Sequence, residues 1–556
     1  MKIALAQLNY HIGNFEKNVS KIIAAVNNAR KQQADLVVFA ELAICGYPPR
    51  DFLEFDDFIN QCDASIDLIA KECIGIAAIV GAPGVNPHPE GKNLFNSAYF
   101  LSDGKIQSTH HKGLLPNYDV FDEYRYFEHG KKFHVVEYKE HTIALTICED
   151  IWDIEVDRMY TVCPMDELKK QSPDLMINIA ASPFSYDHAE ARKKIMQGNA
   201  VKYQLPLFYV NHVGSQTELI FDGGSMIFDA KGKILDELDY FKEDFRIYEF
   251  EKNTIAVVPP GNENRKQPVQ NRNPGTNKIQ RIHDALVLGI SDYFNKMGFK
   301  KAILGLSGGI DSAVTLVLAA KALGKENVKA VLLPSVYSSS HSIKDAEDLA
   351  KNSGCEYDTI GISDVFNSFL KTLGSQFKGL PSDLAEENLQ ARTRGALLMA
   401  LSNKFGYILL NTSNKSELAV GYGTLYGDMC GGLSVLGDVY KTEIYELAEF
   451  INMEKEIIPG NTIVKPPSAE LRHDQKDTDS LPDYDLLDKI LFQYIENRKG
   501  PKELIEMGFE KELVKRVLKL VNSSEYKRHQ TPPILRVSNK AFGMGRRMPI
   551  VGKYWP

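Results

Sequence analysis

The sequence predicts an α/β protein built from two domains. Its 556 residues exceed the length at which one hydrophobic core keeps growing, so at least two cores are expected. Short β-rich runs alternate with helical stretches along most of the chain, a pattern typical of layered α/β folds. Residues 258–275 are poor in apolar residues and rich in Pro, Asn and Gly. We therefore predict a first domain over 1–257, a linker over 258–276 and a second domain over 277–556.

Composition and charge exclude several classes of protein. A hydrophobic content of 44% and a charged content of 25% are ordinary for a globular protein in water. The net charge of −8 argues against a nucleic-acid partner, which would need clustered Lys and Arg. No apolar run approaches eighteen residues, and the amino terminus resembles a strand rather than a signal peptide. Seven scattered cysteines without CxxC pairs suit a reducing compartment. We expect a cytoplasmic protein with no membrane partner and no zinc site.

The first domain is predicted from runs of β-branched and aliphatic residues that alternate with amphipathic stretches. Helices are expected over 15–32, where apolar residues recur three and four positions apart, and over 188–202. The predicted strands are 2–8, 36–40, 77–81, 94–101, 142–147, 175–179 and 207–211.

The second domain shows a stricter alternation of helix and strand. The predicted helices are 277–297, 312–323, 342–353 and 385–404, and the predicted strands are 301–306, 328–333, 357–362 and 407–412. Strands separated by single helices indicate a parallel, doubly wound sheet, with ligands above the carboxyl ends of the strands.

A glycine turn between the strand at 301–306 and the helix that follows it predicts an anion site. Glycines let the backbone approach a ligand closely, and the start of a helix offers unpaired N–H groups. The pattern Ser-Gly-Gly-x-Asp-Ser at 307–312 resembles the pyrophosphate loop of ATP pyrophosphatases, and no Walker-type loop occurs in the chain. That resemblance implies ATP as a substrate. The residues expected to bind it here are Gly305, Leu306, Ser307, Gly308, Gly309, Ile310, Asp311 and Ser312.

Three residues with catalytic chemistry follow separate strands of the first domain. Glu41 follows Leu-Val-Val-Phe-Ala, Lys112 follows a β-rich run, and Cys148 follows Thr-Ile-Ala-Leu-Thr-Ile. A thiol with a pKa of about 8.5 is only a few per cent thiolate at neutral pH. A carboxylate can take its proton, and an ammonium group can stabilise the oxyanion of a tetrahedral intermediate. Each residue alone is more often structural.

In this order the three residues resemble the Glu-Lys-Cys triad of the nitrilase superfamily, which has an αββα-sandwich fold. The resemblance implies Glu41 as general base, Lys112 as stabiliser of the intermediate and Cys148 as the nucleophile. It also implies a second glutamate after the lysine, for which Glu123 is the candidate and Glu128 the rival. Further candidates for binding a small amide substrate, glutamine, are Tyr118, Ser182 and His188.

A nitrilase-type amidase joined to an ATP pyrophosphatase domain resembles the glutamine-dependent NAD synthetase family along almost the whole chain. The resemblance implies that glutamine is hydrolysed in the first domain. It also implies that the second domain adenylylates deamido-NAD with ATP, so that ammonia converts it to NAD, AMP and pyrophosphate. Ammonia passed directly between the sites escapes protonation by solvent. The family also implies a homo-oligomer, often an octamer.

Further blocks of the second domain match the same family. Asn388 and Arg392 share a helical face in Glu-Asn-Leu-Gln-Ala-Arg-Thr-Arg. The resemblance assigns these two residues to deamido-NAD, together with Glu417 and Lys527. Thr412 and Lys441 are assigned to ATP. Asp311 and Glu417 are assigned to Mg²⁺, which is usually held by one or two carboxylates and substrate phosphates. Asp428 and Asp438 either bind substrate or cap helices.

Two other interpretations remain open from the residues. A tRNA-modifying enzyme shares the pyrophosphate loop but would need a basic surface, and this chain is acidic. A catalytically inactive first domain could serve as a scaffold, although all three triad candidates are present. GMP and asparagine synthetases also share the loop, but their glutaminase halves differ: one uses a Cys-His-Glu triad and the other an amino-terminal cysteine, whereas the second residue here is Lys2.

Overall fold

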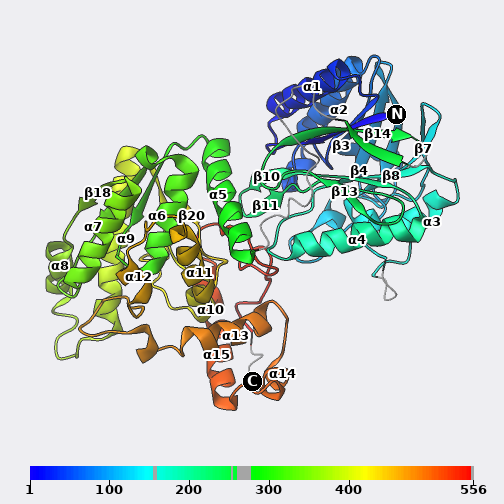
Figure 1. Ribbon diagram of the computed structural model, residues 1–556. Helices are drawn as coiled ribbons and strands as arrows, with labels where there is room; N and C mark the ends of the chain where they lie inside the picture. The colour runs from blue at the N-terminus through cyan, green and yellow to red at the C-terminus, as the bar shows by residue number, and fades with distance from the viewer. Residues whose placement is uncertain (155–158, 252–253, 259–276, 553–556) are drawn as a thin grey trace. The chain divides into compact units, whose positions relative to one another are not determined.

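The computed structural model describes residues 1–154, 159–251, 254–258 and 277–552 (Figure 1). The chain divides into two compact units, Met1–Thr276 and Asn277–Pro556. Most of the predicted linker, residues 259–276, lies outside the described residues. Its first residue, Val258, is the last residue of a strand and pairs with Ile247. In the described part of the chain, no helix is both long and apolar enough to cross a membrane.

The first unit contains two large sheets that pack against each other. The seven-stranded sheet has the order β15-β14-β1-β2-β3-β4-β5, and the six-stranded sheet has the order β13-β12-β9-β8-β7-β6. The strands of the first sheet are β1 (Lys2–Gln7), β2 (Leu36–Val38), β3 (Ala77–Val85), β4 (Leu94–Ser102), β5 (Lys105–His111), β14 (Asp244–Glu251) and β15 (Thr254–Val258). Those of the second are β6 (Val136–Tyr138), β7 (His141–Ile147), β8 (Leu175–Ala180), β9 (Leu207–Asn211), β12 (Met226–Phe228) and β13 (Ile234–Glu237).

Helices cover the outer face of each sheet and give four layers in the order αββα, which confirms the predicted fold class (Figure 1). Helices α1 (Phe15–Lys31) and α2 (Asp56–Glu72) pack on the first sheet, and α3 (Pro164–Lys169) and α4 (His188–Tyr203) on the second. The central strands are apolar on both sides because both of their faces are covered; every residue of β8 is buried. The sequence patterns did not predict α2, α3, β5, β6, the last strands β12 to β15, or the two-stranded ribbon of β10 (Val213–Gln216) and β11 (Leu219–Asp222).

The second unit contains a parallel sheet with the order β18-β17-β16-β19-β20. Its strands are β16 (Lys301–Gly305), β17 (Val328–Leu332), β18 (Glu356–Thr359), β19 (Tyr407–Asn411) and β20 (Leu433–Ser434). The chain moves outward from β16 to β18 and then returns to β19 on the other side of β16. The doubly wound sheet is therefore confirmed, and the crevice at this reversal is where such folds bind ligands.

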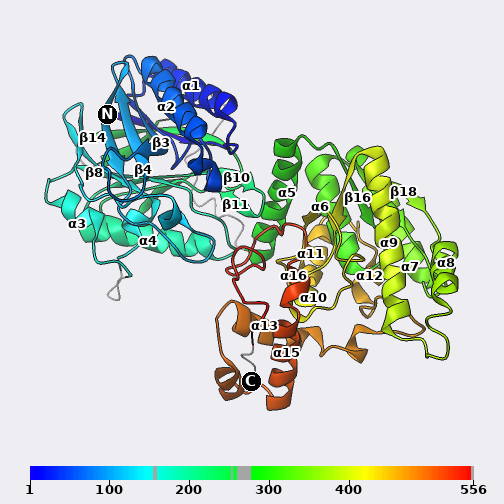
Figure 2. The ribbon, with the colours of Figure 1, turned by 180° about the vertical axis from the view of Figure 1, so that it is seen from behind.

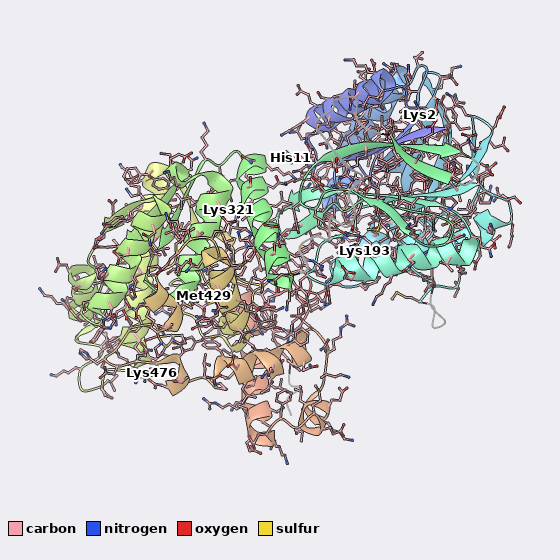
Figure 3. All side chains as sticks on the ribbon, in the orientation of Figure 1. Lys2, His11, Lys193, Lys321, Met429 and Lys476 are labelled. Carbon is pink, nitrogen blue, oxygen red and sulfur yellow. The ribbon has the colours of Figure 1, made fainter. Side chains whose placement is uncertain are left out.

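Helices flank this sheet and extend beyond it (Figure 2). The longer helices are α5 (Lys278–Met297), α6 (Ile310–Leu323), α7 (Ser340–Ser353), α8 (Ser363–Leu373), α9 (Leu384–Phe405), α11 (Lys441–Asn452), α13 (Tyr484–Ile495) and α15 (Lys511–Ser523). The short ones are α10 (Lys415–Val420), α12 (Gly460–Val464), α14 (Pro501–Glu506) and α16 (Glu525–Arg528). Residues of α10, α13 and α15 form a separate apolar cluster that includes Met429, labelled in Figure 3. Helix α6 begins at Ile310, two residues before the predicted start, and Gly309 is its N-cap residue.

Candidate functional site

In the first unit, the fold brings together residues that follow β2, β5 and β7. The Nζ of Lys112 lies 2.7 Å from Oε1 of Glu41, and both side chains are buried. Cys148 is buried as well, and the charges of Glu41 and Lys112 both act on its thiol. The predicted acid, cation and thiol therefore share one buried site, which is built from the ends of strands of both sheets: β2 and β5 belong to the seven-stranded sheet and β7 to the six-stranded one.

The second glutamate in contact with Lys112 is Glu123. Its Oε1 and Oε2 lie 2.8 Å and 2.9 Å from Nζ of Lys112, and Tyr47 donates to Oε1 at 2.9 Å. The rival, Glu128, accepts from the backbone N–H of Lys92 instead. Of the two alternatives left open by the sequence, the structure places Glu123 in the cluster.

Burial and charge set the protonation states of this cluster. Burial opposes the positive charge of Lys112, but the carboxylates of Glu123 and Glu41 outweigh it and hold the pKa of Lys112 well above its ordinary value. Burial, reinforced by Glu41, raises the pKa of the Cys148 thiol. The free protein therefore holds a protonated thiol beside a charged lysine, and a base must take the thiol proton before the sulfur can attack.

The backbone around Cys148 is fixed by Asp150. Cys148 has a φ of +43°, an unusual conformation for a residue with a side chain. The carboxylate of Asp150 accepts from the N–H groups of Ile147 at 3.0 Å, Gly113 at 2.8 Å and Leu114 at 2.9 Å. Asp150 thus joins the turn that carries Cys148 to the residues that follow Lys112. The sequence patterns predicted no role for Asp150.

The predicted substrate-binding residues lie in two small groups. Ser182 is buried, and its Oγ lies 3.0 Å from Nε2 of His188. The ring of His188 stacks on that of Trp152, with 5.0 Å between the ring centroids. Tyr118 donates to Oε1 of Glu149 at 2.9 Å.

Glu149 is a residue that sequence reasoning missed, although it directly follows Cys148. It is buried, and Tyr160 donates to the same Oε1 at 3.0 Å. Burial raises the pKa of Glu149 above its ordinary value. A buried acidic group beside the thiol, held by two tyrosine hydroxyls, can receive a cationic group of a substrate.

In the second unit, a cavity of about 690 Å³ lies above the glycine turn that follows β16. Its volume is within the range of small-molecule sites, roughly 300–1,000 Å³. Gly308 is not among the lining residues; its φ is +84°, and a Cβ there would lie 2.2 Å from the carbonyl oxygen of Ser342. The predicted ATP residues that line the cavity are Gly305, Leu306, Ser307, Gly309, Ile310, Asp311, Ser312, Thr412 and Lys441.

Charged side chains meet on one wall of this cavity. Lys441 Nζ lies 2.5 Å from Oδ2 of Asp311 and 3.7 Å from Oε1 of Glu417. Burial and the charge of Asp311 raise the pKa of Glu417 to about 8. Asn414 donates to Oδ1 of Asp311 at 2.8 Å. The wall thus combines two carboxylates and a lysine next to the start of α6.

The residues predicted to bind deamido-NAD divide into those that line the cavity and one that does not. Asn388, Glu417 and Lys527 line it. Arg392 is not among the lining residues; its Nε donates to the carbonyl of Leu425 at 3.2 Å. Arg394, for which no role was predicted, lines the cavity instead.

The two aspartates left open by the sequence differ in location. Asp428 lines the cavity, where desolvation raises its pKa to about 6. Asp438 is buried away from the lining residues; its carboxylate pairs with Lys415 at 3.0 Å and accepts from Ser538. Asp438 therefore belongs to a structural network.

Residues 465–472 close part of the cavity. Glu470 accepts from Oγ of Ser339 at 2.8 Å and from Oγ of Ser342 at 2.7 Å, at the first turn of α7. Lys465 donates to Ser342 as well, at 3.1 Å. These contacts fix a polar segment that has few apolar residues with which to pack.

Comparison with known proteins identifies each unit. The carbon-nitrogen hydrolase family model matches residues 2–259, and the NAD synthase family model matches residues 282–531. Fold and site thus define a carbon-nitrogen hydrolase unit joined to an NAD synthase unit. A glutamine-dependent NAD(+) synthetase from Synechocystis sp. is 45% identical over 100% of this chain and 99% of its own length. One from Thermotoga maritima is 40% identical over 100% of this chain and 99% of its own length. The chain belongs to the glutamine-dependent NAD(+) synthetase family.

Solved structures agree with this assignment. The glutamine-dependent NAD+ synthetase from Acinetobacter baumannii, in complex with ADP, is 40% identical to this chain. The comparison covers 99% of this chain and 98% of that one, with a TM-score of 0.77. The enzyme from Cytophaga hutchinsonii, at 20% identity and a TM-score of 0.82, shares the fold.

Proposed function

We propose that this chain makes NAD from deamido-NAD with nitrogen that it takes from glutamine, with Cys148 as the nucleophile of the glutaminase. It is a carbon–nitrogen ligase that uses glutamine as amide donor. The observation that carries the assignment of the first site is the contact of Lys112 with Glu41 in the buried site of the Cys148 thiol. That site unites a base, a cation and a nucleophile, which are the groups that amide cleavage requires.

In the first half-reaction, Glu41 takes the thiol proton and the sulfur of Cys148 bonds to the amide carbon of glutamine. Lys112 stabilises the oxyanion of the tetrahedral intermediate. The intermediate collapses, the carbon–nitrogen bond breaks, and Glu41 returns the proton to the leaving nitrogen, which departs as ammonia. Water then hydrolyses the thioester, with Glu41 as base, and glutamate leaves. Ser182, His188 and Tyr118 bind the substrate, and Glu149 is the acidic group available to its α-ammonium.

In the second half-reaction, the carboxylate of deamido-NAD attacks the α-phosphorus of ATP and pyrophosphate leaves. Ammonia then attacks the adenylated carbonyl, AMP departs and the amide of NAD forms. The turn at 305–312 and Thr412 hold the ATP phosphates, and Lys441 neutralises negative charge that develops there. Asn388, Glu417 and Lys527 contact deamido-NAD; Arg392 would act from just outside the cavity.

Asp311 and Glu417 fit a magnesium site. Lys441 contacts both carboxylates, at 2.5 Å and 3.7 Å, so Asp311 and Glu417 lie on the same wall, and the charge of Asp311 contributes to the raised pKa of Glu417. No group of three or more potential ligands from His, Cys, Asp and Glu occurs in the described chain, and Mg²⁺ bound through one or two carboxylates takes its other ligands from phosphates and water. Mg²⁺ held by Asp311 and Glu417 would neutralise phosphate charge.

The conditions under which the enzyme works follow from the same assignment. All seven cysteines are free thiols, which supports a reducing cytoplasm. The proposed partners are the small molecules glutamine, ATP and deamido-NAD, and we propose no nucleic-acid or membrane partner. We also propose a homo-oligomer, which a mass measurement in solution would test.

The variant Cys148→Ala tests the proposal that the first unit hydrolyses glutamine and the second unit makes NAD. We expect this variant to lose glutamine-driven NAD synthesis by more than about 1,000-fold, because nothing else in the cluster can form the thioester. Synthesis from added ammonium salts should remain within about twofold. If Cys148→Ala lost both glutamine-driven and ammonium-driven synthesis while keeping the melting temperature of the wild type, the proposal would be contradicted.

A further inference from the structure

The carboxylates around Lys112 share a second hydrogen-bond donor besides the lysine. Two carboxylates, Glu41 and Glu123, face a single ammonium group in a site that is almost completely buried. Carboxylates that share a buried site without enough compensation take up a proton, because like charges at close range raise their proton affinity. A protonated Glu41 could not accept the proton of the Cys148 thiol. Some other group must therefore help to hold both carboxylates ionised.

Asn96 on β4 is placed to do this. Its side chain is fully buried, and its Nδ2 lies 2.7 Å from Oε1 of Glu41 and 3.3 Å from Oε2 of Glu123. The carbonyl of Asn96 also accepts the backbone N–H of Lys112 at 2.8 Å, where the chain leaves β5. The pairing of β4 with β5 thus fixes Asn96 beside the lysine.

The direction of the amide follows from its partners. Both contacts of Asn96 are carboxylate oxygens, which only accept hydrogen bonds when ionised. The NH₂ group has two hydrogens and can donate one to each carboxylate, whereas the amide oxygen would be repelled by both. The oxygen, Oδ1, is buried and has no hydrogen-bond partner. With the nitrogen of Asn96 directed at the carboxylates, its oxygen is left without a partner, and a buried polar atom without a partner is energetically costly.

Two other buried asparagines of the same unit direct their NH₂ groups elsewhere, although Oδ1 of Asn199 likewise has no hydrogen-bond partner. Asn199 donates to the backbone carbonyls of Ile151 and Ile195, and Asn18 donates to those of His11 and Ile44. Those contacts satisfy backbone groups, which is the usual structural use of a buried amide. Asn96 directs its donor to two ionisable side chains of the site.

We propose that Asn96 is a positioning residue of the glutaminase, which holds Glu41 ionised and aimed so that it can take the proton of Cys148. The inference rests on the function proposed above for Glu41 and Cys148. A donor to the ionised form of a carboxylate lowers its proton affinity. Without Asn96, each carboxylate would lose a hydrogen bond that favours its ionised form.

The other groups that face this pair do not replace Asn96. Tyr47 donates to Glu123 alone, and the N–H of Ala181 donates to Oε2 of Glu41 alone at 2.8 Å. Glu149 adds further negative charge to the environment of the thiol, and Lys112 is already bonded to both carboxylates. Burial raises the pKa of Glu123 to about 7, so Glu123 is close to proton uptake at neutral pH.

The test is the pH profile of kcat/KM for glutamine hydrolysis by the whole enzyme, with Asn96→Leu beside Asn199→Leu. We expect Asn96→Leu to move the acid limb upward by about one pH unit and to lower kcat/KM about tenfold or more at neutral pH, mostly through kcat. Asn199→Leu removes a buried amide of the same size that does not touch the carboxylates. It should reduce thermal stability and leave the acid limb in place. Ammonium-driven NAD synthesis reports on the second unit and should be unchanged in both variants.

A second variant, Asn96→Asp, keeps the shape of the side chain and so guards against a folding defect. The carboxylate that it introduces should move the acid limb of the pH profile upward by more than Asn96→Leu does. An acid limb that coincides with that of the wild type in Asn96→Leu or in Asn96→Asp would overturn the proposal. Cys148→Ala distinguishes this failure from that of the parent proposal. If that variant still hydrolysed glutamine, the catalytic assignment itself would fail, whereas an inactive Cys148→Ala with an unshifted Asn96→Leu refutes only the role of Asn96.

Discussion

The Nζ of Lys441 lies 2.5 Å from Oδ2 of Asp311, although 130 residues separate them in the sequence. Asp311 belongs to the first turn of α6, directly after the glycine turn, and Lys441 is the first residue of α11. The contact therefore joins the start of the phosphate-binding helix to a distant part of the second unit. It also holds the lysine beside the place proposed for the phosphates of ATP.

Replacement of Asp311 tests this arrangement. In Asp311→Asn, Lys441 loses its charged partner and the proposed magnesium site loses one of its two carboxylates. We expect NAD synthesis to fall by more than about 100-fold with either glutamine or ammonium as nitrogen source, while glutamine hydrolysis survives at least in part. Both activities are measured with the same preparation.

The matched control for that experiment is Asp348→Asn on α7, where a surface aspartate pairs with Lys344. An exposed pair of this kind contributes little, so the control should synthesise NAD like the wild type. Retained ammonium-driven turnover in Asp311→Asn would refute the role of Asp311.

Glu417 gives the second unit a stability that depends on pH. Burial and Asp311 raise the pKa of Glu417 from 4.5 to about 8, so between these values the folded chain holds a proton that the unfolded chain has released. The contribution of Glu417 to the free energy of unfolding therefore falls as pH rises through this window. Glu417→Gln should gain stability relative to the wild type between pH 5 and pH 8, by more than about 1 kcal/mol, since one pKa unit corresponds to about 1.4 kcal/mol.

Urea unfolding at several pH values measures this difference, with the exposed Glu454→Gln as the control. A stability difference between Glu417→Gln and the wild type that stays constant from pH 5 to pH 8 would contradict the assignment. The variant should also lose NAD synthesis, because Glu417 is one of the two proposed magnesium ligands.

A buried ion pair in the first unit should be costly to break and inexpensive to replace. Arg192 on α4 makes two contacts of 2.9 Å with Asp222 on β11, and both side chains are fully buried. Arg192→Met leaves an uncompensated carboxylate in the interior, for which we expect a loss of about 3–5 kcal/mol. The double variant with Asp222→Leu should recover most of that loss. Urea unfolding provides the comparison, and a single variant as stable as the wild type would show that Asp222 finds another partner.

The sequence predicted the convergence of Glu41, Lys112 and Cys148 because each follows a strand. Only the structure shows that these strands belong to two sheets, β2 and β5 to one and β7 to the other. The sequence could not separate Glu123 from Glu128. Both lie in an irregular segment without periodicity, where only the path of the folded chain determines which carboxylate reaches Lys112.

The helix α9 shows a related limit. The i, i+4 spacing placed Asn388 and Arg392 on one face, but the cavity is lined by Asn388 and Arg394. The helical spacing predicts which residues share a face of the helix, but it does not predict which of them line the cavity. The contact of Arg392 with the carbonyl of Leu425 depends on a loop that comes later in the chain.

By itself, the sequence determined the α/β class, the positions of the main strands and helices, and the residue types available for chemistry. These follow from local periodicity and from glycine turns. The tertiary structure decided the electrostatic state of the sites: a charged Lys112 between two carboxylates, a protonated Cys148 thiol and the raised pKa of Glu417. Proton affinity depends on how completely distant segments exclude water from a group and on which charges they bring beside it, and local sequence specifies neither.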